Sequence, residues 1–89
     1  MSILSNQEVL MFINKTKSGK NNLCGEKISL LRLELGISQR ELADRLQIAG
    51  LDIDKNAIQR IEAGKRFVTD IELKVFSKVL NIFVDDLLN

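Results

Sequence analysis

The chain has 89 residues, with 13 lysines and arginines, 12 aspartates and glutamates and no histidine, so its formal net charge is only +1. The length allows one small domain, and 45% hydrophobic with 28% charged residues is a globular composition. One cysteine excludes an internal disulfide and a cysteine-based zinc site. No apolar run reaches the roughly 20 residues that span a bilayer. We expect a reduced, cytoplasmic domain without membrane contact, cofactor, metal or small-molecule ligand.

Apolar residues recur at helical spacing, and no segment alternates long enough to predict a strand. Capping boxes, in which Ser or Thr precedes Glu by three residues, mark helix starts at Ser5, Ser38 and Thr69, and Asp54 is a single cap. Helix ends are marked by residues that tolerate the left-handed conformation, namely Gly36, Gly50, Gly64 and Asn81. The prediction is an all-α fold with helices at about 6–14, 25–35, 39–49, 55–63, 70–80 and 84–88.

The polar segment 14–22 has the composition of a linker. It divides the chain into residues 1–22, an N-terminal helix with a basic polar linker, and residues 23–89, a single compact domain. The N-terminal helix is too apolar to be exposed. We expect it either to cover the core or to act as an arm for dimerisation or partner docking; its apolar residues are Ile3, Leu4, Val9, Leu10, Met11, Phe12 and Ile13.

The predicted helix 55–63 has two unlike faces. Ile58 and Ile61 share the side that should enter the core. The other side carries long hydrogen-bonding side chains and no acid; they are Lys55, Asn56, Gln59 and Arg60. Amides pair bidentately with adenine, and cationic side chains pair with guanine. Spacing alone nevertheless favours an ordinary solvated face over a base-reading one.

Two charged residues fall on core-facing positions. Arg32 lies between Leu31 and Leu35, and Glu62 follows Ile58 by four residues. An unpaired buried charge costs several kcal/mol, so we expect Arg32 and Glu62 to meet as an internal ion pair. The alternative is that both side chains reach solvent.

Three segments resemble one known family in the correct order. They are Leu-Gly-Ile-Ser-Gln-Arg-Glu-Leu-Ala-Asp-Arg-Leu (35–46), Ala-Ile-Gln-Arg-Ile-Glu-Ala-Gly-Lys-Arg (57–66) and Leu-Asn-Ile-Phe-Val-Asp-Asp-Leu-Leu (80–88). Residues 25–88 closely resemble the helix-turn-helix DNA-binding domains of the phage Cro/repressor type, also called xenobiotic-response-element-like. The resemblance implies a lambda-repressor-like bundle of five helices, to which this chain adds the N-terminal helix.

The resemblance also implies roles for individual residues. Base-reading side chains would be Lys55, Asn56 and Arg60, with Gln59 beside them. The residues near the DNA backbone would be Ser38, which caps its helix, Gln39, Arg40, Lys65 and Arg66. Arg32 and Glu62 match the internal ion pair of the family, which agrees with the inference from spacing.

The chain departs from the family between the two helices of the motif. Where the family has Gly and a short turn, this chain has Gln47 and about five extra residues within 47–53. We expect the helix to continue its apolar face to Ala49 and to stop at Gly50. The remaining hydrophobic residues should attach the lengthened connection to the core; they are Leu51 and Ile53.

The expected function is therefore a sequence-specific regulator of transcription that binds double-stranded DNA, and more specifically a repressor. The low net charge predicts weak non-specific binding, so we expect a homodimer that reads two half-sites. The alternative is a protein-interaction module, such as an antitoxin or a regulator subunit, that docks a partner through the N-terminal helix or the C-terminal apolar patch around Phe83. An enzyme is not expected, because the sequence offers no nucleophile–base set and no phosphate-cradling glycine loop.

Overall fold

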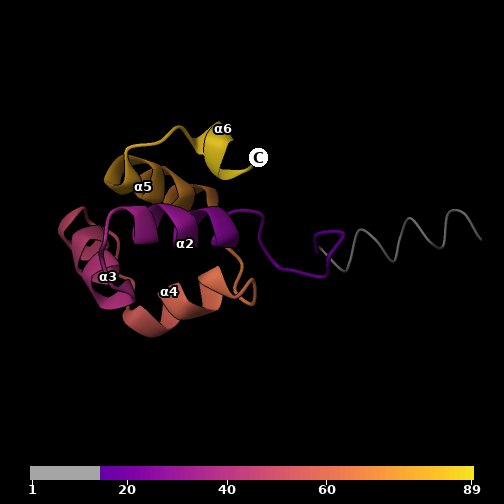
Figure 1. Cartoon of the computed structure of the whole chain (residues 1–89), viewed down its shortest axis with the longest axis horizontal. Coiled ribbons are helices and arrows are strands. Elements are labelled where there is room, and N and C mark those ends of the chain that lie inside the picture. Colours follow the sequence, from indigo (N-terminus) through magenta and orange to yellow (C-terminus); the bar gives the residue numbers. More distant parts are fainter. Residues whose placement is uncertain (1–14) are drawn as a thin grey trace, which may run out of the picture.

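The computed structural model describes residues 15–89, which form five α-helices and no strand (Figure 1). Their bounds are α2 (Gly25–Glu34), α3 (Gln39–Ile48), α4 (Lys55–Glu62), α5 (Asp70–Leu80) and α6 (Val84–Leu87). The all-α prediction is confirmed for these residues, and each helix end lies within one residue of its expected position. The predicted helix at 6–14 and its cap at Ser5 lie outside the described residues. None of the five helices is long and apolar enough to cross a lipid bilayer.

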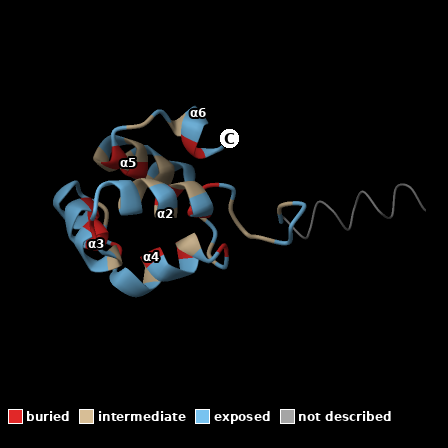
Figure 2. Ribbon diagram, in the orientation of Figure 1, coloured by how far each residue is buried: buried red, intermediate tan, exposed pale blue. Residues whose placement is uncertain are grey.

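Helix α2 runs through the middle of the bundle, with α5 on one side and α4 on the other, and α3 closes one end (Figure 1). Helix α3 contacts both α4 and α5, and α6 covers part of α5. The helices turn their buried residues inward, as Figure 2 shows. The buried core consists of Cys24, Ile28, Ile37, Leu42, Ala43, Leu46, Ile53, Ile58, Ile61, Phe76, Leu80 and Leu87.

Two expected core positions are wrong. Leu35 was predicted to extend the apolar face of α2, but its side chain is 49% exposed. The helix ends one residue earlier, and the chain turns away at Gly36, whose φ is +70°. Ala49 is likewise exposed, because α3 ends at Ile48 and Ala49 is its C-cap residue.

The helix starts follow local capping chemistry. Thr69 forms the complete box: its hydroxyl accepts from the Glu72 amide at 3.1 Å, and the Glu72 carboxylate accepts from the Thr69 amide at 2.9 Å. Ser38 forms only half of its predicted box, accepting from the Glu41 amide at 3.0 Å. The Glu41 carboxylate instead pairs with Arg45, one helical turn further on, at 2.9 Å.

Contacts with α3 and the core hold both ends of the lengthened connection after α3. Gly50 adopts the left-handed conformation with φ +99°, and the Leu51 amide donates to the Leu46 carbonyl at 2.9 Å. Ile53 is buried, and its carbonyl accepts from the Gln47 amide group at 2.7 Å. The additional residues therefore fold back over the end of α3, and α4 begins from an anchored point.

The segment predicted as a linker is not a free linker at its C-terminal end. The Asn21 amide donates to the Gly64 carbonyl at 2.8 Å. The Asn22 side chain donates to the Ile61 carbonyl at 3.0 Å and accepts from the Gly25 amide at 2.8 Å. The prediction of a solvated linker up to residue 22 is therefore wrong for these two asparagines, which join the start of α2 to the end of α4.

Gly25 lies at a close approach of α2 to the end of α4. A Cβ atom at this position would collide with the Ile61 carbonyl oxygen and would lie 2.8 Å from Oδ1 of Asn22. The two groups that it would displace are both held in hydrogen bonds. Only glycine therefore fits the first position of α2.

We expect Gly25→Ala to lower the free energy of unfolding by about 1–3 kcal/mol, because the methyl group overpacks this contact. Urea unfolding followed by circular dichroism measures the loss. Glu34→Ala, at an exposed position of the same helix, is the control and should change stability by less than about 0.5 kcal/mol. Equal stability of the two variants would contradict the close approach.

Candidate nucleic-acid interface

Helix α4 presents one face to solvent. Asp54 caps its N-terminus, where the carboxylate accepts from the Ala57 amide at 2.8 Å. Ile58 and Ile61 are completely buried and hold the helix on the core. The opposite face, exposed along its length (Figure 2), carries all four predicted base-reading residues: Lys55, Asn56, Gln59 and Arg60.

A groove of about 420 Å³ separates this face from α3. On the α3 side it is lined by Arg40, Ala43, Asp44 and Gln47, and on the α4 side by Asp54, Lys55 and Asn56. Arg40 therefore lies across the groove from the first turn of α4. Because Asp44 and Asp54 share the groove, its charge is mixed rather than strongly basic.

The last residue of α4 is held by the helices on either side of it. Nε of Arg32 donates to Oε2 of Glu62 at 2.7 Å, and Nη2 donates to Oε1 at 3.0 Å. Both side chains are nearly buried, with 11% and 8% of their surface exposed. The side-chain amide of Gln39 also donates to Oε1 of Glu62 at 3.0 Å. The ion pair inferred from spacing is thus present, and Gln39 at the start of α3 joins it.

Glu62 therefore links α2, α3 and α4 through one carboxylate. Hydrogen bonding to Glu62 raises the pKa of Arg32 above its already high ordinary value, so the guanidinium is charged at neutral pH. A third guanidinium hydrogen bond, from Nη1 to the Ile37 carbonyl at 2.9 Å, fixes the turn before α3. The relative placement of the three helices depends on this cluster.

The loop after α4 carries the two remaining predicted backbone contacts. Lys65 is exposed. Arg66 forms a bidentate pair with Glu72 in α5, at 2.9 and 3.1 Å. The carbonyls of both loop residues accept hydrogen bonds from the segment before α2: Lys65 from Asn21 at 2.9 Å, and Arg66 from Asn22 at 2.8 Å.

A family model described as helix-turn-helix matches residues 28–87, which include α3, α4 and the groove between them. The chain belongs to this helix-turn-helix family. The match is to its Cro/C1 type, which implies a lambda-repressor-like fold, DNA binding and typically no enzymatic activity. A search of the curated proteins and a search of the solved structures found no match.

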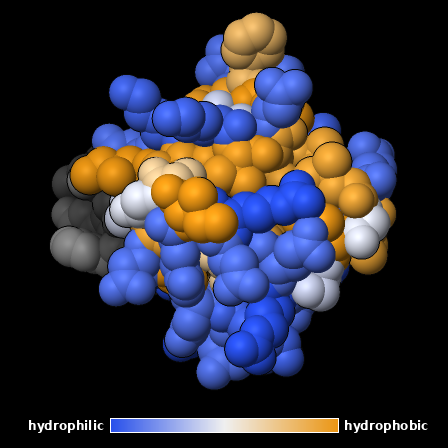
Figure 3. Space-filling view, turned by 90° about the vertical axis from the view of Figure 1, so that its left-hand side faces the viewer, coloured by the Kyte–Doolittle hydropathy of each residue, from blue (hydrophilic) through white to orange (hydrophobic). Residues whose placement is uncertain are grey.

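The helix-turn-helix surface has few free cations. Among residues 15–89, three acidic partners neutralise Arg32, Arg45 and Arg66. The cations around α3 and α4 that form no salt bridge within this part of the chain are Arg40, Lys55, Arg60 and Lys65. Figure 3 views the end formed by α3: hydrophilic residues cover the lower part, on the side of α4, and hydrophobic residues gather at the level of α2 and α5.

Sequence reasoning missed three residues that support this surface, namely Asn21, Asn22 and Glu72. The partners of the two asparagines lie about 40 residues further along the chain. No local pattern marks such contacts. Glu72 was recognised only as the second half of a capping box, and it performs that role and the pairing with Arg66 at the same time.

No metal site is found in the part of the chain that the structure describes, since residues 15–89 contain no group of three or more potential ligands. The single cysteine, Cys24, is buried, and burial raises the pKa of its thiol to about 11. At neutral pH it is therefore a protonated core residue.

We expect Arg32→Ala to lower the free energy of unfolding by about 3–5 kcal/mol, because it leaves the Glu62 carboxylate nearly buried without its cation. The double variant Arg32→Met/Glu62→Leu removes both charges and should recover much of this loss. Chemical denaturation of Arg32→Met, Glu62→Leu and the double variant gives the coupling energy. The exposed Glu41–Arg45 pair is the matched control and should couple by only about 0.3–0.5 kcal/mol. Similar coupling in the two pairs would contradict a structural role for Glu62.

The ion pair of Glu72 should make the stability of the fold sensitive to acid. The hydrogen bond from Arg66 holds the pKa of this carboxyl below its ordinary value. Its stabilising contribution is therefore complete above the unfolded pKa of about 4.3 and is lost as the pH falls through the lower folded pKa. We expect Glu72→Gln to be less stable than the parent chain at pH 7, with a difference that shrinks toward pH 3. Denaturation across this pH range tests the expectation, and a pH-independent difference would contradict it.

Proposed function

We propose that this helix-turn-helix protein is a sequence-specific regulator of transcription that places α4 in the major groove of double-stranded DNA. The observation that carries the proposal is the exposed, acid-free face of α4, whose end is held by the nearly buried Arg32–Glu62 pair. A major groove about 12 Å wide admits an α-helix. Rigid attachment matters because base readout requires side chains to reach base edges in one orientation.

The chemistry of this face suits base edges. Asn56 and Gln59 can donate and accept together, which is the pattern that adenine presents in the major groove. Lys55 and Arg60 supply donors for guanine, whose major-groove edge offers two acceptors. We assign base reading to these four residues.

Backbone contacts come from both ends of the motif. The start of α3 supplies free amides near Ser38 and Gln39, and a helix N-terminus attracts phosphate. Arg40 and Lys65 add exposed positive charge. Arg66 contributes less, because Glu72 already neutralises its guanidinium.

The small number of cations without an acidic partner also favours a homodimer. Each domain offers only a few cations to phosphates, so one domain alone binds weakly at physiological salt. Two domains on one DNA face, reading half-sites about 34 Å apart, gain affinity from their simultaneous engagement. We propose that the dimer acts as a repressor.

A protein-interaction module, such as an antitoxin or a regulator subunit, is the second candidate. It is favoured by large hydrophobic side chains on the surface, of which Ile48 (88% exposed) and Phe83 (79% exposed) are the most exposed. Phe83 occupies the N-cap position of α6 without supplying a cap, so its exposure has no local structural purpose. Such a protein would retain partner binding when the α4 face is changed.

Selection from random duplex DNA, followed by binding assays on the selected site, tests the proposed function. We expect Arg60→Ala to cost about 1–3 kcal/mol and to relax specificity at one position of each half-site. Lys65→Ala should weaken binding to all sequences equally and lower the salt slope by about 1 for each domain. Lys74→Ala, at an exposed position of α5, is the matched control and should have no effect. Failure to select any sequence, or equal effects of all three changes, would contradict the proposal.

A further inference from the structure

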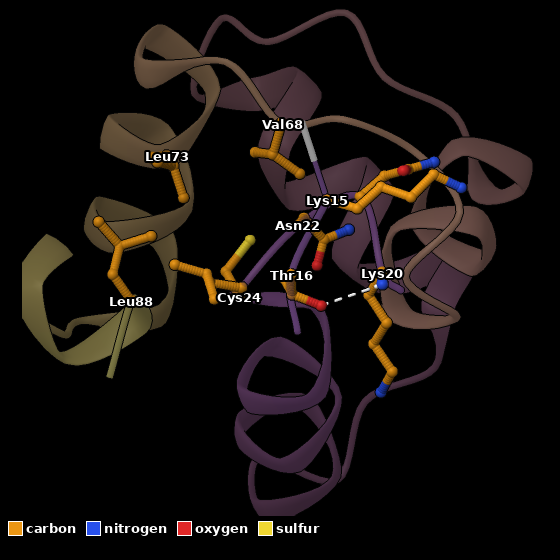
Figure 4. Close-up of a pocket in the computed structure, with 10 residues that line it drawn as sticks. Lys15, Thr16, Lys20, Asn22, Cys24, Val68, Leu73 and Leu88 are labelled. Carbon is orange, nitrogen blue, oxygen red and sulfur yellow. Dashed lines mark hydrogen bonds between the residues drawn. The ribbon is translucent and has the colours of Figure 1, made fainter. Parts of the chain in front are cut away.

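A cavity of about 350 Å³ opens beside the first described residues, on the side of the domain away from the groove between α3 and α4. Its apolar wall comes from distant parts of the chain: Cys24 before α2, Val68 before α5, Leu73 in α5 and Leu88 after α6 (Figure 4). In the close-up, the side chains of Leu73 and Leu88 point toward each other, and the Cys24 sulfur points to the side of Val68.

The cavity is continuous with exposed hydrophobic surface. Leu23, which also lines it, is 63% exposed, and Leu88 is 36% exposed. The opposite rim is polar and carries Lys15, Thr16 and Lys20. An apolar floor with a polar rim is the form of a site that takes a few apolar side chains.

We propose that the cavity binds the apolar N-terminal segment of the same chain through Val9, Phe12 and Ile13. In the helix expected from the sequence these three residues share one face, because they are spaced by three and four. Their side chains would fill the cavity and pack against its apolar wall. The segment also joins the described chain at Lys15, which itself lines the cavity.

The short connection favours the chain's own segment over that of a second copy. Phe12 precedes Lys15 by three residues, which span at most about 10 Å even when fully extended. A ligand attached this closely acts at a millimolar effective concentration. A segment from another molecule at micromolar concentration competes poorly with it.

Occupation of the cavity connects the N-terminus to the DNA-facing loop. The cavity wall includes Asn21 and Asn22, whose side chains bind the carbonyls of Lys65 and Arg66. The bound segment would therefore stabilise, through these asparagines, the loop that presents Lys65. This consequence rests on the proposed function, whereas the binding of the segment does not.

Nuclear Overhauser measurements on the full chain in the absence of DNA test the proposal directly. Phe12 is one of only four aromatic residues, which keeps the aromatic spectrum simple. We expect contacts from its ring to the methyl groups of Val68, Leu73 and Leu88. In a mixture of isotope-labelled and unlabelled protein, filtered spectra should show none of these contacts between copies. Absent contacts, or contacts found only between copies, would overturn the proposal, and neither result depends on whether the protein binds DNA.

The cysteine in the cavity wall provides a second measurement. Cys24 is buried, so a thiol reagent reaches it only when the cavity wall opens transiently. We expect Phe12→Ser in the full chain to increase the rate of Cys24 modification several-fold, because the bound segment suppresses this opening. Met11→Ser is the matched control, since residue 11 lies on another face of the expected helix. Equal modification rates in the two variants would overturn the proposal.

Discussion

A single carboxylate sets the geometry of this protein. Glu62, the last residue of α4, accepts two hydrogen bonds from Arg32 in α2 and one from Gln39 in α3. Removing either charge would leave the other nearly buried and unpaired, at a cost of several kcal/mol. Asp54 fixes the opposite end of α4 through its cap. With both ends held, the exposed face of α4 has a fixed orientation on the bundle, which is the property that the proposed reading of DNA requires.

The hydrophilic and hydrophobic parts of the surface lie over different helices of the bundle. The side of α3 and α4 is hydrophilic with few free cations, and hydrophobic residues gather at the level of α2 and α5 (Figure 3). A net charge of +1 cannot hold one domain on DNA by electrostatics alone. We propose that specific contacts and a second domain supply the remaining affinity.

Most of the fold could be predicted because its determinants are local. Caps and apolar spacing marked every described helix to within one residue, and the positions of Arg32 and Glu62 revealed their pairing. The errors arose where tertiary contacts determine the position of a residue. The asparagines at 21 and 22 bind carbonyls about 40 residues away, which no local pattern marks. Leu35 continued the spacing of its helix, yet the early turn at Gly36 left it half exposed. The expected base-reading residues share the exposed face of α4, and their contacts with DNA stay a prediction.

The most direct test of the account is an amide chemical-shift titration of the full chain with a selected duplex. Our account predicts that the largest shifts fall on residues 39–40, 55–60 and 65, with α5 and α6 little changed. Shifts concentrated on α5 and α6, with the amides of α4 unmoved, would show that this domain uses another surface.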